Sequence, residues 1–472
     1  MKIKQIAATK NGRLLVIGVV LQIIYLLFSI IYFKERIIAA DPAHFLFHIS
    51  GTGTYYYLQR VIVLFSGVLP VMGTQLGCSI HTAMLLYSIN TALMYSLPFI
   101  LILVVFKDES LAICLLLFQF IFPIKTHYLA ISELQHGLIF LLVYWAFIGY
   151  RYRQNKSILN QPITYILLFI IMNAHPLIAL AFYGSCLLMS NQKTYWHFKD
   201  QRVLMLLAIA FFLITRILLA TEYETILMTH SLNGILNDYN IYLLRLMISK
   251  LIRGYFLAII VGSLGFYFLV RNYKLKIMLP LIAIVIVNFA FIYLRFHEIG
   301  LVETFYEIYL SIIFFLAFLS VALYGVNIKK PLKNMVAAII ILLMLMQGYR
   351  TIVYADFYKT RMTIYSKVMS QMAAANIDKA VLPFYKAPMS KIVDFYCTPF
   401  ETYLLSKIDD DPTNDGMIVT YWLSDTVDIE RLKHYNASLI RFNIDSFEVF
   451  PFEKYPNFNF SDAPLETLDI NY

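Results

Sequence analysis

The run Leu15–Phe33, LVIGVVLQIIYLLFSIIYF, decides the class of fold, because it is long and apolar enough to cross a lipid bilayer. A helix that spans the hydrocarbon core takes about 20 such residues. Comparable runs recur at Val203–Ala220, Ile277–Leu294 and Met335–Met346. Of the 472 residues, 60% are hydrophobic and 14% charged, whereas a soluble domain carries roughly 25% charge. We therefore predict an integral membrane protein.

The apolar runs predict a mainly α-helical, polytopic bundle with about eleven spans. They fall at approximately 14–33, 82–106, 111–124, 135–150, 160–174, 177–190, 203–220, 255–270, 277–294, 305–326 and 335–352. The first run exceeds the roughly 7–15 residues of a signal-peptide core, so it predicts an uncleaved signal anchor. Residues 1–352 form the predicted membrane domain. Residues 353–472 form a predicted small α/β soluble domain, with an amphipathic helix at 354–376 and strands at 380–385 and 417–422.

The distribution of charge predicts how the chain is threaded. The overall charge is +9, but the residues from Val353 onward carry 17 acids and 11 bases, so the basic excess lies in the first 352 residues. With a cytoplasmic N-terminus, the inner loops hold 17 bases against three acids, as the positive-inside rule requires. The C-terminal domain is then extracytoplasmic, in a multi-pass protein of a bacterial inner or cell membrane. No basic module or motif indicates binding of nucleic acid.

One apolar segment, Val61–Ile80, is predicted to be re-entrant or to lie on the membrane surface rather than to cross it. A full crossing would place three basic loops on the outer side, against the positive-inside rule. Gly67, Pro70 and Gly73 interrupt the segment. Cys78 and Cys397 could share the outer compartment, but nothing in their spacing indicates a disulfide.

The titratable residues gather on the predicted outer side. Nine of the ten histidines fall there, with His197 as the exception. Ionisable groups near the membrane are costly and usually mark functional sites. A transporter would place some of them at mid-span, so this pattern favours chemistry at the outer membrane face.

The sequence Ala40-Asp41-Pro42-Ala43-His44 follows the first span closely. Asp41 could act as a general base toward an acceptor hydroxyl. The structural alternative is a helix start, with Asp41 as the N-cap and Pro42 as the first helical residue. His44 and His48 have the i, i+4 spacing of a metal-ligating pair, but two histidines alone make no metal site.

The segment Ser132-Glu133-Leu134-Gln135-His136 begins another span. Ser132 and Gln135 fit a capping box, and Glu133 suits the positive end of a helix dipole. Glu133 and His136 also project from one helical face at the membrane surface. This segment therefore supports a structural and a catalytic interpretation, and the two are compatible.

Two arginines are candidates for binding phosphate. Arg216 lies near the outer end of its span, and Arg245 lies on a predicted interfacial helix at 239–253. A guanidinium matches phosphate oxygens bidentately. The alternatives are snorkelling toward headgroups and attraction to anionic lipid.

Taken together, the arrangement resembles the GT-C class of polytopic glycosyltransferases, which use sugars linked to polyprenyl phosphate. The resemblance rests on the cytoplasmic N-terminus and on the long first outer loop, which has an acidic residue soon after the first span and is closed by a re-entrant-like segment. A short second outer loop with Ser132-Glu133…His136 and a soluble C-terminal domain complete it. It implies that Asp41 is the catalytic base, that Glu133 and His136 shape the acceptor or metal site of the catalytic centre, and that Arg216 holds the donor phosphate. His44 and Arg245 are further candidates for binding substrate or phosphate. GT-C members often carry paired acids in the first loop, whereas the nearest companion of Asp41 is Glu35. No metal ligands are assigned, and a divalent metal cofactor is left open.

The predicted function is transfer of a sugar, with inversion, from a lipid-linked donor to a glycan, lipid or protein acceptor. The first alternative is a polysaccharide polymerase or ligase, which would depend more on outer arginines such as Arg245. The second is a transporter or flippase of lipid-linked glycans. No Walker loop, dinucleotide fingerprint or Gly-Xaa-Ser-Xaa-Gly motif is present, which argues against a nucleotide-driven pump.

Overall fold

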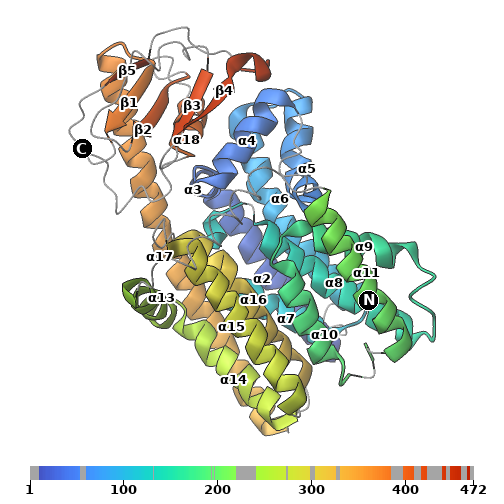
Figure 1. The fold of residues 1–472 in the computed structure, drawn as a ribbon. Coiled ribbons are helices and arrows are strands. Elements are labelled where there is room, and N and C mark those ends of the chain that lie inside the picture. The colour runs from blue at the N-terminus through green and yellow to red at the C-terminus, as the bar shows by residue number, and fades with distance from the viewer. Residues whose placement is uncertain are drawn as a thin grey trace.

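The computed structural model describes residues 10–53, 60–130, 132–192, 194–195, 197–218, 241–272, 275–297, 303–325, 330–383, 397–408, 416–422, 438–442, 447–458 and 465–467. These residues form a long helical bundle with a smaller group of strands at one end (Figure 1). We call the end of the bundle nearest the strands the upper end and the opposite end the lower end. The chain is therefore mainly helical, as predicted.

The first half of the bundle contains ten α-helices and two short helices of other types in the described part of the chain. They are α2 (Lys10–Ile31), α3 (Phe33–Ile37), α4 (Asp41–Thr52), α5 (Val61–Gln75), α6 (Ile80–Ile100), the π-helix η1 (Leu101–Val105), α7 (Glu109–Ile121), the 3-10 helix η2 (Thr126–Tyr128), α8 (Glu133–Arg153), α9 (Pro162–Ala174), α10 (Ile178–Met189) and α11 (Phe198–Ile217).

The second half continues with five helices, and the C-terminal region adds one more helix and the strands. The helices are α13 (Ile241–Gly254), α14 (Phe256–Asn272), α15 (Leu275–His297), α16 (Glu303–Gly325) and α17 (Lys330–Ala374). The C-terminal region contains β1 (Lys379–Pro383), α18 (Thr398–Ser406), β2 (Ile418–Trp422), β3 (Ser438–Phe442), β4 (Phe447–Pro451), the 3-10 helix η5 (Phe452–Lys454) and β5 (Leu465–Thr467).

Each of the eleven apolar runs forms a helix over most of its described residues, but the helices differ in length. Within the described residues, five are long and apolar enough to cross a membrane, or six if the bent pair α13–α14 counts as one span. The helices α5, α7, α9 and α10 are apolar but shorter. Each of these four helices is shorter than the about 20 residues that a helix needs to cross the bilayer by itself. The count of eleven spans therefore stays a prediction.

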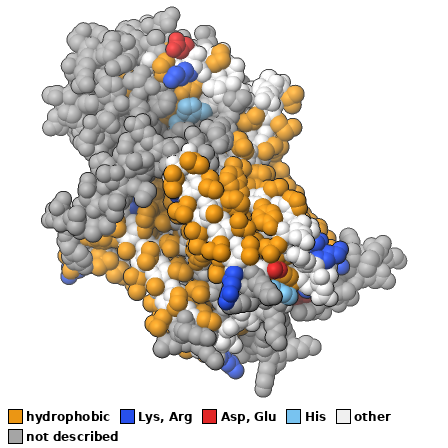
Figure 2. All heavy atoms as spheres, turned by 45° about the vertical axis from the view of Figure 1, so that its right-hand side comes forward, with side chains coloured by type: hydrophobic (Ala, Val, Ile, Leu, Met, Phe, Trp, Pro, Cys, Tyr) orange, Lys and Arg blue, Asp and Glu red, His pale blue; other side chains and the backbone are white. Residues whose placement is uncertain are grey.

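Large apolar side chains cover the outside of the bundle. On α2, for example, Ile23, Ile24 and Leu27 are each more than half exposed. Figure 2 shows hydrophobic side chains spread across one face of the described helices, with charged side chains gathered near its margins. A soluble protein rarely exposes so large an apolar surface, which supports a multi-pass membrane protein.

Small residues allow the closest helix contacts inside the bundle. A Cβ on Gly265 of α14 would lie 2.3 Å from the carbonyl oxygen of Ala317 on α16, so only glycine fits there. A Cβ on Gly184 of α10 would lie 2.7 Å from a methyl carbon of Leu316 on α16. Such close backbone approach is typical of helix pairs in membranes. These contacts hold α16 at the centre of the second half of the bundle.

The segment Val61–Ile80 is more regular than predicted. Helix α5 runs without a break through Gly67, Pro70 and Gly73, so the predicted interruption is wrong. Pro70 has no backbone N–H, so it cannot donate the usual hydrogen bond within the helix. Helix α5 accommodates it, as helices packed against neighbours in a membrane do. Helix α5 packs against α6 to form a hairpin.

Strands β2, β1 and β5 form a parallel sheet in that order, and β3 pairs with β4 in an antiparallel sheet. Strands β1 and β2 match the predicted strands at 380–385 and 417–422. Helix α17 is continuous across residue 352, where the domain boundary was predicted, and so runs directly from the bundle to β1. All four cysteines are free thiols, including Cys78 and Cys397.

Candidate active site

Asp41 is the first residue of α4 and is half-buried. The prediction that it serves as the N-cap is wrong: Ala40 holds that position, and no side chain caps the helix. Ala40 has φ 45° and ψ −120°, a conformation that costs energy in any residue with a Cβ. Long-range contacts must therefore hold the chain in the bend just ahead of Asp41.

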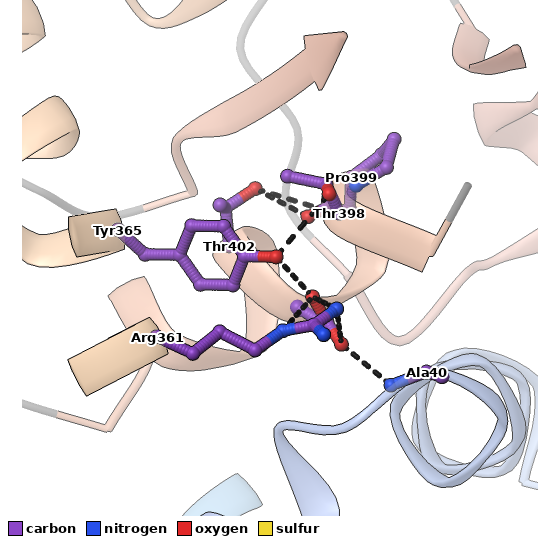
Figure 3. A network of polar contacts seen from close by, with 7 residues as sticks. Ala40, Arg361, Tyr365, Thr398, Pro399 and Thr402 are labelled. Atoms are coloured by element: carbon purple, nitrogen blue, oxygen red, sulfur yellow. Dashed lines mark hydrogen bonds and ion pairs between the residues drawn. The ribbon is translucent and has the colours of Figure 1, made fainter. Parts of the chain in front are cut away.

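The carboxylate of Glu401 on α18 supplies that contact. Its Oε1 accepts a hydrogen bond of 2.5 Å from the backbone N–H of Ala40. The Nη2 of Arg361 on α17 lies 2.7 Å from both oxygens of Glu401, and the Tyr365 hydroxyl donates to Oε2 at 2.5 Å. Figure 3 shows Arg361 and Tyr365 approaching from one side and Ala40 from the other. We call these four residues the Glu401 network.

The Glu401 network is closed to solvent. Arg361 is 1% exposed and Glu401 is 0% exposed. A charge buried so deeply is tolerated only when it is paired with an opposite charge and its remaining donors and acceptors form hydrogen bonds. The network therefore fixes three segments against one another: α17, α18 and the turn that presents Asp41.

Glu133 is the first residue of α8, and it forms an ion pair with Arg60. Arg60 Nη1 lies 3.4 Å from Glu133 Oε1, and both side chains are largely buried. The N-cap of α8 is Ser132, whose Oγ accepts from the N–H of Gln135, as predicted. The Gln135 side chain instead donates to Thr126 Oγ1 at 3.1 Å. The helix start is thus capped by Ser132, and the Glu133 carboxylate pairs with Arg60.

Asp41 and Glu133 are coupled electrostatically to the same side chain. Tyr87 of α6 is 1% exposed, and its hydroxyl experiences the charges of both Glu133 and Asp41. Such coupling needs short separations within the protein interior. The two carboxylates predicted to be catalytic therefore both lie within electrostatic range of Tyr87.

Arg216 lies at the end of α11 and reaches the C-terminus of α9. Its Nη2 is 3.4 Å from the carbonyl oxygen of Met172 and 3.5 Å from that of Asn173. A cation is favoured there, because the last carbonyls of a helix carry partial negative charge. The side-chain Oδ1 of Asn173 accepts at 2.6 Å from the N–H of Val61, next to Arg60. Arg216 and Arg60 are therefore linked through α9.

His175 lies between these two arginines, in the break between α9 and α10. Burial, together with the charges of Arg60 and Arg216, holds the pKa of its imidazole well below the ordinary value. The ring centroid of Tyr309 on α16 lies 6.1 Å from that of His175. Tyr309 in turn interacts with Arg295 and experiences the charges of Arg60 and Asp41.

These residues at the upper end of the bundle are related by electrostatic coupling and a few direct contacts, and we call the set the carboxylate–arginine cluster. Its members are Asp41, Arg60, Tyr87, Glu133, His175, Arg216, Arg295 and Tyr309. The set contains two carboxylates and three guanidiniums, of which Arg60 and Glu133 form an ion pair, together with an imidazole whose pKa is lowered. Such a set can take a proton from a hydroxyl and can bind an anionic group.

Asp41, Glu133 and Arg216 belong to this cluster through electrostatic coupling and the Arg60–Glu133 pair, whereas three other predicted residues have different neighbours. His136 is buried in the bundle, with Nδ1 2.8 Å from Ser66 Oγ. His44 lies 2.7 Å from His48, Nε2 to Nε2, and its ring packs on Phe400 of α18. Arg245 is exposed on α13.

Arg60, His175 and Arg295 were not predicted as site residues. Each is a charged or titratable residue at the end of an apolar run, and this signal could have identified them. Among the described residues, no group of three or more His, Cys, Asp or Glu could hold a metal ion. The His44–His48 pair therefore lacks the further ligands that a metal site needs.

Comparison of the chain with known protein families, with curated proteins and with solved structures gives no match.

Proposed function

We propose that this protein is a membrane glycosyltransferase that moves a sugar from a polyprenyl-phosphate donor to an acceptor hydroxyl. The observation that supports it best is the electrostatic coupling, together with the Arg60–Glu133 ion pair, that relates Asp41, Glu133 and Arg216 within the carboxylate–arginine cluster. Three residues chosen from separate parts of the sequence are thus related through shared neighbours, which supports the proposal. The resemblance to GT-C enzymes assigns these positions to a base, an acceptor site and a phosphate site.

In the proposed reaction, Asp41 takes the proton of the acceptor hydroxyl as that oxygen attacks the anomeric carbon. A new C–O bond forms while the bond from the anomeric carbon to the lipid phosphate breaks. The phosphate leaves with the bonding electrons, and attack from the opposite face inverts the anomeric configuration. Arg216, with a second guanidinium nearby at Arg60, stabilises the charge that develops on the departing phosphate.

The proposal includes the topology predicted from charge. The chain crosses the membrane about eleven times, the cluster faces the extracytoplasmic side, and residues 353–472 form an α/β domain there. The short helices α5, α7, α9 and α10 can complete crossings or line a cavity only when other helices cover their ends. The bases of the lower end, such as Arg151 and Arg271, would face the cytoplasm.

The test is the variant Asp41→Asn, which keeps the shape of the side chain but removes the base. Transfer from a radiolabelled polyprenyl-phosphate sugar should fall at least about 100-fold, the usual contribution of a general base. Glu453→Gln is the matched control, because Glu453 is exposed on η5, outside the cluster. Full activity of Asp41→Asn in folded protein would refute the proposal. Activity that survives in Asp41→Asn but is lost in Arg245→Ala would favour a polymerase or ligase instead.

A further inference from the structure

A second polar site lies at the upper end of the bundle, between α13, α16 and α17. It is a pocket of about 690 Å³, and its lining includes Lys125, Lys250, Arg253 and Arg350. Glu303 and Asp356 also line it, so four bases face two acids. No member of the carboxylate–arginine cluster lines this pocket. It is therefore a separate place where an anion can bind.

The charged groups of the pocket are held in position from several elements. Glu303, at the start of α16, forms ion pairs with both Lys125 and Lys250. Arg350 Nη2 donates at 2.6 Å to the carbonyl oxygen of Gly254, and its guanidinium lies over the ring of Phe256. The carboxylate of Glu303 thus holds two ammonium groups close to each other. Arg350 stabilises the junction between α13 and α14. The pocket therefore keeps an excess of positive charge, and the charged groups that carry it are already held in place for an anion.

Helix α13 places the pocket at the level of lipid headgroups. It meets α14 at an angle of 89°, so it lies across the direction of the bundle. Tyr242, Ile248 and Ile252 are exposed apolar residues on α13, while Lys250 and Arg253 border the pocket. An amphipathic helix of this kind lies in the plane of the membrane interface.

We propose that this pocket binds the phosphate of an anionic membrane lipid, with the lipid tails beside α13 and α14 in the bilayer. Lys125, Lys250 and Arg253 supply the positive charge that recognises the phosphate. Tyr306 anchors α13 beside the pocket, since its hydroxyl donates at 2.8 Å to the carbonyl oxygen of Met247. The proposal concerns lipid binding alone and does not depend on glycosyl transfer.

The test measures lipid bound to the purified full-length protein in detergent by native mass spectrometry, with phosphatidylglycerol and phosphatidylcholine as probes. We expect wild-type protein to retain phosphatidylglycerol over phosphatidylcholine at least fivefold, roughly the 1 kcal/mol expected per basic residue. The double variant Lys250→Gln/Arg253→Gln should lose this preference. Arg245→Gln, an exposed base on the same helix, should keep it.

A second variant tests the pocket without changing its charge. Ser249 lines the pocket, and Ser249→Trp should exclude the headgroup by volume and also abolish the preference. Unfolding midpoints of all variants should stay within a few degrees of wild type, because the altered side chains lie at the surface.

Three results would overturn the proposal. The first is equal retention of the two lipids by wild-type protein. The second is a loss of the preference for phosphatidylglycerol in Arg245→Gln as large as in the double variant, which would indicate diffuse attraction. The third is a full preference for phosphatidylglycerol in Ser249→Trp. Soluble glycerol phosphate distinguishes the source of the phosphate. If it displaces phosphatidylglycerol completely at equal concentration, the ligand is a free phosphate rather than a lipid.

Discussion

Arg361 on α17 and Glu401 on α18 form a fully buried ion pair, and the same carboxylate binds the backbone just ahead of Asp41. The three elements that meet there are distant in sequence. The C-terminal region therefore helps to build the candidate active site, and its residues can be tested for that role.

Loss of one partner of this ion pair should destabilise the protein. Arg361→Met leaves Glu401 charged and buried without its main partner, which costs about 3–5 kcal/mol. We expect a clear fall in the unfolding midpoint of the purified protein. Lys367→Met, an exposed position on the same helix, is the matched control and should unfold like wild type. An unchanged midpoint in Arg361→Met would show that the pair does not hold these segments.

Arg216 should act on the donor rather than on the acceptor. Arg216→Met removes a guanidinium that is proposed to bind the lipid phosphate, and we expect the KM for the donor to rise about tenfold. The KM for the acceptor should change little. Arg202→Met, at the other end of α11, serves as the control. Equal effects of the two variants on donor KM would argue against a phosphate site at Arg216.

His127 should make stability depend on pH. Burial and the nearby charge of Arg36 lower the pKa of this imidazole to about 3, whereas an unfolded histidine titrates near 6.5. Below pH 6.5 the unfolded chain therefore binds a proton that the folded chain does not, and stability falls as pH drops from 6.5 toward 3. By pH 5 the loss from this group is about 2 kcal/mol.

The variant His127→Gln isolates this contribution. Its unfolding midpoint should fall less than that of wild type between pH 7 and pH 5, because the titrating group is gone. Parallel curves for the two proteins would mean that His127 is protonated in the folded state.

Cys78 gives a direct test of topology. It lies between α5 and α6 and is the one exposed cysteine among the four, all of which the structure describes. If the upper end of the bundle is extracytoplasmic, a membrane-impermeant maleimide should label intact cells at this residue. Cys78→Ser should abolish the signal. Labelling that appears only after the membrane is permeabilised would reverse the proposed orientation.

Local patterns predicted the helices well but not their tertiary partners. The apolar runs, the Ser132 cap and the surface helix at α13 could all be read from neighbouring residues. Asp41 was misassigned as a cap because the group that satisfies this helix start is Glu401, 361 positions away from Ala40. His136 has the spacing of a partner for Glu133, yet α5 covers it and leaves it bonded to Ser66.

The rest of the cluster was missed for the same reason. Arg60 and Glu133 are far apart in sequence, and only the packing of α5 on α8 and α9 makes them a pair. The continuity of α17 was within reach of sequence reasoning, since no proline or glycine lies between Tyr349 and Ala374. The domain boundary was placed at the change in polarity, which need not coincide with the end of a helix.

Helix α17 joins the lipid environment to the Glu401 network without a break. Its 45 residues give a length of about 68 Å at roughly 1.5 Å per residue, about twice the thickness of a hydrocarbon core. A helix answers a thinner bilayer by tilting, and Arg361 and Tyr365 must then shift with it. A change in the thickness of the surrounding membrane would thus change the position of the backbone at Asp41.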